Sequence, residues 1–303
     1  DEVRFWKLIE KYKVSWTELS PALIRMQMIK DEKLFKDLDL SSLRMICTGG
    51  EPWTEKPWKW LFQVIGKSKV PIMNSAGGTE VSGSILHCCL HRPFKVGSFN
   101  APIPGMSADI LNLDGQKVST NEMGELVMRK SSIGLTKSLW NDDKRYIDNY
   151  WSVIKDYWVH GDLASRDADG HWYLHGRSDD TIKVSGKRIG PSELESVIVK
   201  SGKAKEVAAV GIPDANKGSK IILSIVPAEN NDQKESFFED LVIKDLGKSF
   251  KPDKVIFLKD LPKTRNMKIM RRVIKSCLSN QDPGDLSTLL NPESVEEIRS
   301  HAI

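Results

Sequence analysis

The stretch His175-Gly-Arg-Ser-Asp-Asp-Thr-Ile-Lys-Val-Ser-Gly-Lys-Arg-Ile189 separates two regions with different sequence patterns in this chain of 303 residues. Upstream, residues 97–174 hold short alternating runs between Asp/Gly turns, a pattern typical of β-strands. Downstream, residues 192–198 carry apolar side chains at helical spacing, and Pro191 suits the first position of a helix. Apolar runs typical of strands follow at residues 207–211, 221–226 and 255–258. The stretch therefore predicts the start of a small α+β domain after a β-rich region.

The first hundred residues read as α/β structure. The apolar spacing between Phe5 and Lys36 predicts helix, and residues 43–47 and 70–73 read as short buried strands. Each strand leads into a glycine-rich loop, Thr48-Gly-Gly-Glu-Pro52 in one case and Asn74-Ser-Ala-Gly-Gly-Thr-Glu80 in the other. Ligands of open α/β sheets bind at such strand ends, so both loops are candidate binding elements.

The composition excludes several classes of protein. The 45 Lys and Arg residues against 41 Asp and Glu leave a formal charge of +4, too small and too dispersed to predict a nucleic-acid surface. No apolar run approaches the roughly 18 residues of a membrane span, and the charged start Asp1–Arg4 does not resemble a signal peptide. A soluble, cytoplasmic protein is expected, and small acidic ligands are compatible with its charge.

The four cysteines are too few and too irregularly spaced for a secreted disulfide framework, which favours reduced thiols. The run His87-Cys-Cys-Leu-His91 allows two interpretations. Thiolate and imidazole both bind zinc, but the spacing lacks the gap of a zinc turn and no second ligand pair follows. A buried strand with packed cysteines is the alternative, and it is the favoured one.

A second motif, Pro262-Lys-Thr-Arg-Asn-Met-Lys-Ile-Met-Arg-Arg272, follows the first by some eighty residues. The two stretches resemble the hinge and the catalytic-lysine loop of the adenylate-forming superfamily, which includes acyl-CoA synthetases, luciferases of the firefly type and peptide-synthetase adenylation domains. Further runs resemble the acetyl-CoA synthetase branch, namely 139–146, 149–151 and 286–293. The resemblance extends from about residue 43 to 303. It implies an AMP-forming acyl-CoA synthetase, which joins a carboxylate to ATP and passes the acyl group to CoA.

The resemblance assigns the catalytic role to Lys268, whose ammonium would stabilise the charge that builds at the α-phosphate. On composition alone, a solvated basic segment is the favoured interpretation of this loop, which also carries Lys263, Arg265, Arg271 and Arg272. The sequence departs from the family at the two residues before the lysine, where Asn266-Met267 replaces the usual Ser-Gly. A stiffer or differently set loop is therefore expected.

The resemblance also assigns the ATP/AMP and Mg²⁺ contacts. Asp162 matches the family aspartate that binds the ribose hydroxyls, and Arg177 matches an arginine at ribose and phosphate. Thr79 matches a residue near phosphate and Glu80 a ligand of Mg²⁺, an ion that prefers oxygen donors. Without the resemblance, these would be ordinary turn residues. The remaining nucleotide contacts are expected at Gly50, Glu51, Pro52 and Asn74.

Acyl and CoA sites follow in the same way. Acetyl-CoA synthetases shorten the acyl pocket with a tryptophan where this chain has Gly77, and the neighbouring aromatic position holds Ala76. We expect an acid larger than acetate, unless neighbouring side chains refill the space. Gly186 and Arg188 match residues at the CoA tunnel, and Asp179 matches the hinge about which the small domain turns.

The predicted fold is therefore α/β with a β-rich subdomain plus a small α+β C-terminal domain. Its expected parts are residues 1–96 of a large domain, a barrel-like region at 97–178, a mobile domain at 179–281 and a tail at 282–303. The superfamily's phosphate loop ending in Pro-Lys-Gly is not found, which predicts a partial fold, inactive alone. Three explanations stay open for its N-terminal half, namely a separate chain, truncation of the sequence or decay of the gene. The alternative is a non-catalytic nucleotide-binding or regulatory protein, stabilised as a homo-oligomer.

Overall fold

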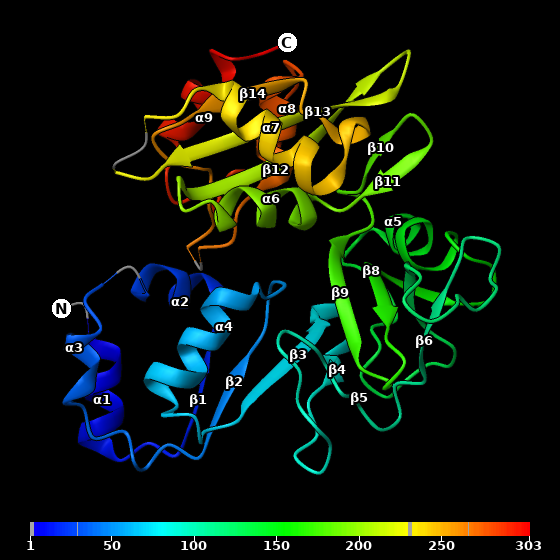
Figure 1. The fold of residues 1–303 in the computed structure, drawn as a ribbon. Coiled ribbons are helices and arrows are strands. Elements are labelled where there is room, and N and C mark those ends of the chain that lie inside the picture. The colour runs from blue at the N-terminus through cyan, green and yellow to red at the C-terminus, as the bar shows by residue number, and fades with distance from the viewer. Residues whose placement is uncertain (1–2, 29, 230–231, 266) are drawn as a thin grey trace. The chain divides into compact units, whose positions relative to one another are not determined.

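The computed structural model describes residues 3–28, 30–229, 232–265 and 267–303. The chain forms two compact units, residues 1–174 and residues 175–303 (Figure 1). The division falls at the start of the first motif, between Leu174 and His175, whereas the sequence placed a domain boundary after residue 178.

The first unit begins with a mixed sheet of five strands in the order β1-β2-β3-β4-β5. Strands β1, β2 and β3 are parallel, and β4 and β5 add antiparallel pairs. The elements are α1 (Arg4–Tyr12), β1 (Trp16–Leu19), α2 (Pro21–Gln27), α3 (Lys33–Lys36), β2 (Met45–Thr48), α4 (Glu55–Trp60), the π-helical turn η1 (Leu61–Ile65), β3 (Ile72–Gly78), the 3₁₀ turn η2 (Thr79–Val81), β4 (Gly83–His87) and β5 (Ala101–Pro102).

The expectation of helix throughout residues 5–36 is wrong at β1. Side chains in β1 alternate between exposed and buried, a period of two that a short strand shares with its parallel partner β2. Pro21 then starts a new helix, because the Ser20 hydroxyl caps α2 by accepting a hydrogen bond from the Leu23 amide at 3.3 Å.

A second sheet of the first unit has four strands in the linear order β6-β7-β8-β9. The order is linear, and Phe99 forms an antiparallel bridge with Trp172 of β9. Strand β9 runs across the division between the two units. The elements are β6 (Ala108–Leu111), β7 (Gly124–Met128), α5 (Asp143–Tyr146), the π-helical turn η3 (Ile147–Trp151), β8 (Trp158–Arg166) and β9 (Trp172–Arg177).

The second unit is the predicted α+β domain. Its sheet has the order β12-β13-β14, with β12 antiparallel and β14 parallel to β13, beside the hairpin β10-β11. The elements are β10 (Ile182–Val184), β11 (Lys187–Ile189), α6 (Pro191–Lys200), β12 (Ala204–Asp214), β13 (Gly218–Pro227), α7 (Glu235–Leu246), the 3₁₀ turn η4 (Lys248–Phe250), β14 (Lys254–Phe257), α8 (Arg271–Leu278) and α9 (Glu293–Arg299).

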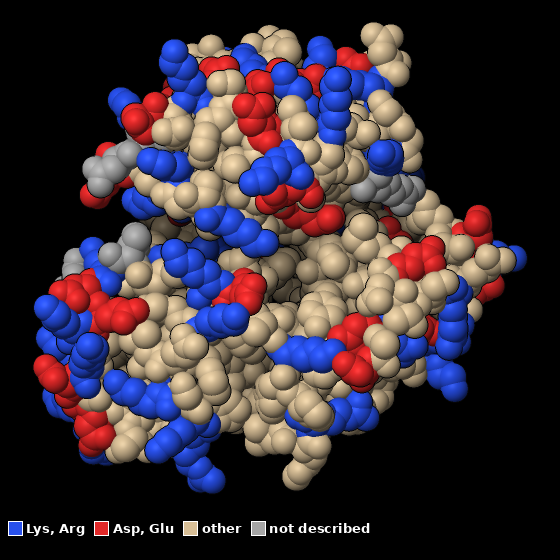
Figure 2. Space-filling view, in the orientation of Figure 1, with Lys and Arg blue, Asp and Glu red and all other residues tan. Residues whose placement is uncertain are grey.

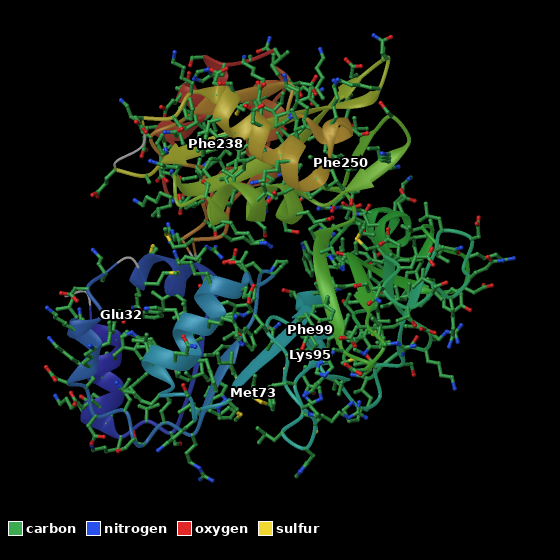
Figure 3. The ribbon with its side chains drawn as sticks, viewed as in Figure 1. Glu32, Met73, Lys95, Phe99, Phe238 and Phe250 are labelled. Atoms are coloured by element: carbon green, nitrogen blue, oxygen red, sulfur yellow. The ribbon has the colours of Figure 1, made fainter. Side chains whose placement is uncertain are left out.

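Both faces of this sheet are buried. Alternate residues of β12 enter two different cores, Val207 and Ala209 on one side and Ala208 and Val210 on the other. Helices α6 and α7 cover the first side, where Phe238 is fully buried (Figure 3), and α8 and α9 cover the second. Strands that are buried on both faces consist of nearly continuous apolar residues, so these strands could be predicted from the sequence.

The visible surface mixes blue and red side chains over both units, in keeping with the small net charge (Figure 2). Among the described residues, no helix has both the length and the apolar content needed to span a bilayer.

Candidate functional site

The end of β2 meets β3 in the first unit. A Cβ atom on Gly49 would lie 2.9 Å from the Ser75 carbonyl oxygen, so the loop after β2 touches β3 at a residue that has no side chain. Ser75 Oγ donates a hydrogen bond to the Thr48 carbonyl at 3.3 Å, and Thr48 Oγ1 donates to Asn74 Oδ1 at 3.2 Å. The loop expected at residues 74–80 is mostly strand, because β3 continues to Gly78, and the parallel pairing brings the loop after β2 against β3 itself.

Asn74 is buried, and both ends of its side-chain amide are used inside the protein. Its oxygen accepts the Thr48 hydroxyl, and its nitrogen donates to the Gly97 carbonyl at 3.2 Å. These bonds fix β3 to the end of β2 and to the segment that leads to β5. A nucleotide contact from Asn74 remains a prediction.

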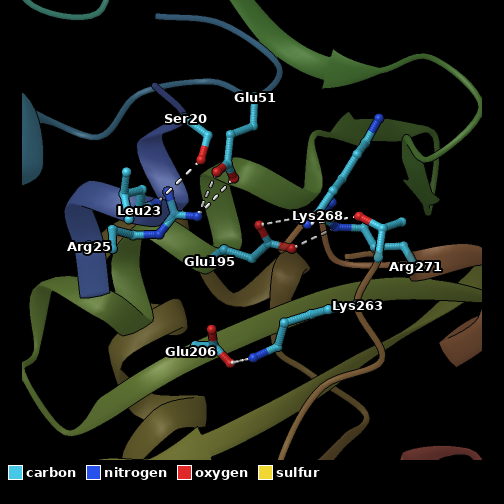
Figure 4. A network of polar contacts seen from close by, with 10 residues as sticks. Ser20, Leu23, Arg25, Glu51, Glu195, Glu206, Lys263, Lys268 and Arg271 are labelled. Atoms are coloured by element: carbon cyan, nitrogen blue, oxygen red, sulfur yellow. Dashed lines mark hydrogen bonds and ion pairs between the residues drawn. The ribbon is translucent and has the colours of Figure 1, made fainter. Parts of the chain in front are cut away.

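Glu51 is held by an arginine that the sequence did not single out. Arg25 Nη2, on α2, donates to both carboxylate oxygens of Glu51, at 2.9 Å and 2.8 Å (Figure 4). About three-quarters of each side chain is buried. Gly50 precedes Glu51 with φ +94°, a left-handed conformation that favours glycine, and Pro52 follows. The ion pair therefore fixes the shape of the Gly50–Pro52 loop.

Glu80 and His160 lie beside Gly78. A Cβ atom on Gly78 would meet Glu80 Oε2 at 2.9 Å and His160 Cε1 at 3.4 Å. His160 and Asp162 are two residues apart on β8 and so share a face, with Nε2 and Oδ2 3.2 Å apart. His160 therefore contacts Asp162 and lies near Gly78, as Glu80 does, while the ligand roles of Glu80 and Asp162 remain predictions.

Tyr150 and His160 complete this cluster, and the sequence analysis did not assign either of them to the site. The Tyr150 hydroxyl donates to Glu80 Oε1 at 3.1 Å, and its ring stacks on Trp158 with a centroid separation of 5.2 Å. The stack fixes the hydroxyl that orients the carboxylate. The two-residue spacing of His160 and Asp162 could have indicated that their side chains are neighbours. Tyr150 and Glu80 are 70 residues apart in the sequence, so no local pattern indicates their contact.

Gly77 has a structural explanation that the sequence did not show. A Cβ atom there would lie 2.0 Å from the Gly83 carbonyl oxygen and 2.5 Å from Ser84 Cα, both in the β4 backbone. The expected free volume beside Gly77 is therefore occupied by β4. Glycine at this position is explained by the close approach of two strands, and by itself it no longer supports an enlarged acyl cavity.

The donor chemistry is compatible with Mg²⁺ at Glu80. Mg²⁺ is usually held by one or two carboxylates together with phosphate oxygens and water, and not by a cage of protein ligands. Within the described part of the chain, no group of three or more His, Cys, Asp or Glu side chains could hold a metal. Cys88, in the run weighed as a zinc site, is buried, and its thiol donates to the Ser98 carbonyl at 3.4 Å.

Two predicted residues lie close together in the first motif. Arg177 Nε and Asp179 Oδ1 are 3.2 Å apart, and Gly176 before them has φ +105°. The next carboxyl group, Asp180, lines a cavity of about 60 Å³ in the second unit. Burial raises the pKa of Asp180, and the charge of Asp179 adds to the rise.

Gly186 occupies the tip of the β10-β11 hairpin. Ser185 and Gly186 have φ values of 49° and 81°, as in the two-residue turns that suit the twist of a hairpin. No described atom lies within 4 Å of a Cβ built on Gly186, so the tip is open. Arg188 pairs with Lys183 in the hairpin, and its side chain lies outside the described structure.

The catalytic-lysine motif forms a tight loop in the second unit. The Thr264 amide donates to the Lys268 carbonyl at 2.9 Å, and Lys263 bridges to Ile269. Met267 has φ +64°, so the loop keeps a left-handed conformation at the position where the family has glycine. Asn266, the other departure from the family, lies outside the described residues.

The cations that flank Lys268 in the sequence are not equivalent. Lys263 is 5% exposed and pairs with Glu206 and Asp260, while Arg271 binds both oxygens of Glu195. Figure 4 draws the Lys263–Glu206 and Arg271–Glu195 pairs with dashed lines and shows the Lys268 side chain extended. Arg272 donates to the carbonyls of Pro283 and Asp285.

Lys268 differs from these three residues. It is exposed, and among the described residues no ion pair is recorded for its ammonium group. Ion pairs and carbonyl contacts thus hold Lys263, Arg271 and Arg272 to the domain. Lys268 and Arg265, which is also exposed, are left as cations that can meet a ligand.

Two family models match the chain. The model of AMP-binding enzymes matches residues 1–140, and the model of the AMP-binding enzyme C-terminal domain matches residues 193–268. An acetyl-coenzyme A synthetase of Pasteurella multocida is 35% identical over an alignment 310 residues long, gaps included. The alignment covers 99% of this chain and 47% of the relative. The chain thus spans about half the length of the curated relatives it matches.

Solved structures share the fold. An acetoacetyl-CoA synthetase from Streptomyces lividans superposes with a TM-score of 0.83 and 22% identity, covering 97% of this chain and 46% of that one. An anthranilate CoA ligase in complex with anthranoyl-AMP gives a TM-score of 0.74 and 24% identity, covering 89% and 51%. The family models, the relatives and the fold agree, and the chain belongs to the family of AMP-binding enzymes.

Proposed function

We propose that the protein takes part in the AMP-forming synthesis of an acyl-CoA. A carboxylate oxygen attacks the α-phosphate of ATP, pyrophosphate leaves, and the CoA thiolate then displaces AMP from the acyl-adenylate. The observation that carries this proposal is the state of Lys268, an exposed cation on a tightly bonded loop. Lys263, Arg271 and Arg272 are held by other groups, and Arg265 is the other exposed cation of the motif.

Charge is the main demand of the first step, because two anions must meet while negative charge grows at phosphorus. In the proposal the Lys268 ammonium neutralises that charge, and Asp162 accepts hydrogen bonds from the ribose hydroxyls. Arg177 and Thr79 contact the ribose and phosphates, and the Gly50–Pro52 loop borders the adenine. Bound Mg²⁺ would neutralise phosphate charge, and Glu80 would be its protein ligand, with the carboxylate oriented by Tyr150.

The second step needs a different set of groups. We place the turning point of the small domain at Asp179, as the resemblance implies, and the pantetheine arm and phosphates of CoA at Gly186 and Arg188. The open hairpin tip supports this assignment, because no side chain of the described structure fills the space beside Gly186. The acid is expected to exceed acetate, with Ala76 at the acyl pocket.

The test is carboxylate-dependent exchange of labelled pyrophosphate into ATP, with acids from acetate to hexanoate. The chain is assayed alone and together with any protein encoded beside it. Exchange that depends on a partner supports a split synthetase and identifies its acid. Absence of exchange in both settings, with retained binding of AMP, contradicts the synthetase and favours a non-catalytic nucleotide-binding protein.

Lys268→Ala should lower the rate of adenylation about 10²–10³-fold, the usual cost of losing one group that stabilises developing charge. Thioester formation from supplied acyl-adenylate should change little, because the thiolate attacks the acyl carbon and no negative charge builds up at a phosphorus atom under attack. Lys244→Ala, which removes an exposed lysine on α7, is the matched control. Equal losses in both half-reactions would remove Lys268 from the role proposed here.

A further inference from the structure

The C-terminal tail reaches back to the loop that carries Lys268. The Leu290 amide donates to the Lys263 carbonyl at 2.8 Å, and Leu289 forms an antiparallel bridge with Thr264. Thr264 in turn donates its amide to the Lys268 carbonyl at 2.9 Å. The tail therefore lies beside the base of the loop as a third strand-like segment.

Asn291 adds a second connection at the same place. This side chain is buried, and its oxygen accepts the Lys263 amide at 3.1 Å. Its nitrogen donates to the Leu261 carbonyl at 2.8 Å and to Asp260 Oδ2 at 2.9 Å. One amide group thus bonds to three residues of the segment that enters the loop, and it satisfies buried backbone groups there.

The tail is itself fixed to the domain. Val295 and Ile298 of α9 are buried in the core that α8 shares, and the Ile303 amide donates to the Leu278 carbonyl at 2.9 Å. The loop is held on its other side by Lys263. Burial disfavours the charge of Lys263, but the carboxylates of Asp260 and Glu206 raise its pKa, so the ammonium stays charged and paired.

A lysine side chain has four rotatable bonds, so the direction of its ammonium depends on how well its backbone is fixed. Displacement of a catalytic group by about 1 Å can cost two orders of magnitude in rate. We propose that Asn291 and the Leu290 amide are positioning elements that hold the base of the Lys268 loop from the C-terminal tail. This inference rests on the proposed adenylation function and adds two residues outside the lysine motif to it.

The sharpest test removes one hydrogen bond and little else. Leu290→Pro deletes the amide that donates to Lys263, at a side chain that is 52% exposed, and Leu290→Ala retains the amide as the matched control. Asn291→Ala removes the buried amide. Its control is Glu297→Ala, which cuts the tail's bonds to the Lys259 amide, upstream of the loop.

Two readouts are measured on each folded variant of the full chain, with the partner if the unsubstituted protein requires one. Amide hydrogen exchange at Thr264 and Met270 should become at least about tenfold faster in Leu290→Pro and Asn291→Ala, and stay unchanged in both controls. Adenylation should fall about tenfold with KM for ATP within about twofold, while thioester formation from supplied acyl-adenylate is preserved.

Faster exchange with unchanged adenylation would overturn the inference, since the tail would then be structural only. The same holds for equal losses of adenylation in Leu290→Pro and Leu290→Ala. Should Asn291→Ala fail to fold, Leu290→Pro decides. If the unsubstituted protein catalyses neither half-reaction, the proposed function fails on its own, and unchanged exchange at Thr264 in Leu290→Pro would then refute the coupling of tail and loop.

Discussion

The substitution Gly77→Ala separates two explanations of the same glycine. A Cβ atom at position 77 would sit 2.0 Å from the Gly83 carbonyl oxygen, whereas ordinary contact begins at 3.4 Å. The shortfall exceeds 1 Å and is set by backbone, so β3 and β4 must separate where Gly77 pairs with Ser84. If Gly77 instead marked an open acyl pocket, one methyl group would be accommodated.

The cost can be estimated from its parts. Overpacking costs about 1–3 kcal/mol, and weakening of neighbouring ladder hydrogen bonds costs about 0.5–1.5 kcal/mol each. Loss of glycine's freedom in the unfolded chain offsets about 0.4–1 kcal/mol. We expect a net loss of about 2–4 kcal/mol from the first unit. A domain of that size should melt about 5–12 °C lower.

Gly78→Ala is the matched control, one residue along the same strand. The nearest atom to its added Cβ is Glu80 Oε2 at 2.9 Å, the end of a side chain that can move, so we expect a loss below about 1 kcal/mol. Thermal unfolding followed by near-UV circular dichroism compares the two variants. Equal unfolding midpoints of the two variants would refute the reasoning. A Gly77→Ala protein of unchanged stability that prefers shorter acids would also refute it, and would support an open acyl pocket beside Gly77.

Two further predictions concern the second unit. Met267→Gly should change stability by less than about 1 kcal/mol, because relief of left-handed strain offsets the greater freedom of unfolded glycine. Met267→Ile, β-branched at the same φ, should destabilise by about 1–2 kcal/mol; equal melting of both variants would contradict a left-handed Met267. Asp180→Asn should stabilise the unit at pH 7, since a raised pKa means that ionised Asp180 disfavours folding. This gain should shrink as the pH falls toward the usual value of 3.8 and vanish below it; a gain that does not depend on pH in denaturant titrations would rule out ionisation as the cause.

Local sequence patterns determined much of the second unit. Pro191 begins α6 as predicted, and the Gly190 amide donates to Glu193 Oε1 at 3.0 Å, a bond that closes the first turn. The apolar runs became β12, β13 and β14 because strands buried on both faces need no alternation. The Ser185-Gly186 pair gave a two-residue hairpin turn.

The same local reasoning failed for β1. Four residues are too few to show a period of two against a surrounding helical pattern, and β1 exists because β2 pairs with it along Trp16–Leu19. A pairing partner 29 residues away is not part of any sequence window. The loop after β2 could be predicted, because strand ends and glycines are local signals. The loop expected after residue 73 is wrong at residues 74–78, which continue β3 because β4 pairs with residues 75–78.

The motifs of the sequence by themselves determined the family, the order of the domains and the identity of Lys268, Asp162 and Glu80 as candidates, because each depends on residue type at a fixed spacing. Only the tertiary structure decided which cations of the motif are paired, through the contacts of Lys263 with Glu206 and of Arg271 with Glu195. It also showed that β4 fills the space beside Gly77. These are contacts between distant segments, whose geometry is set by packing and cannot be read from either segment alone.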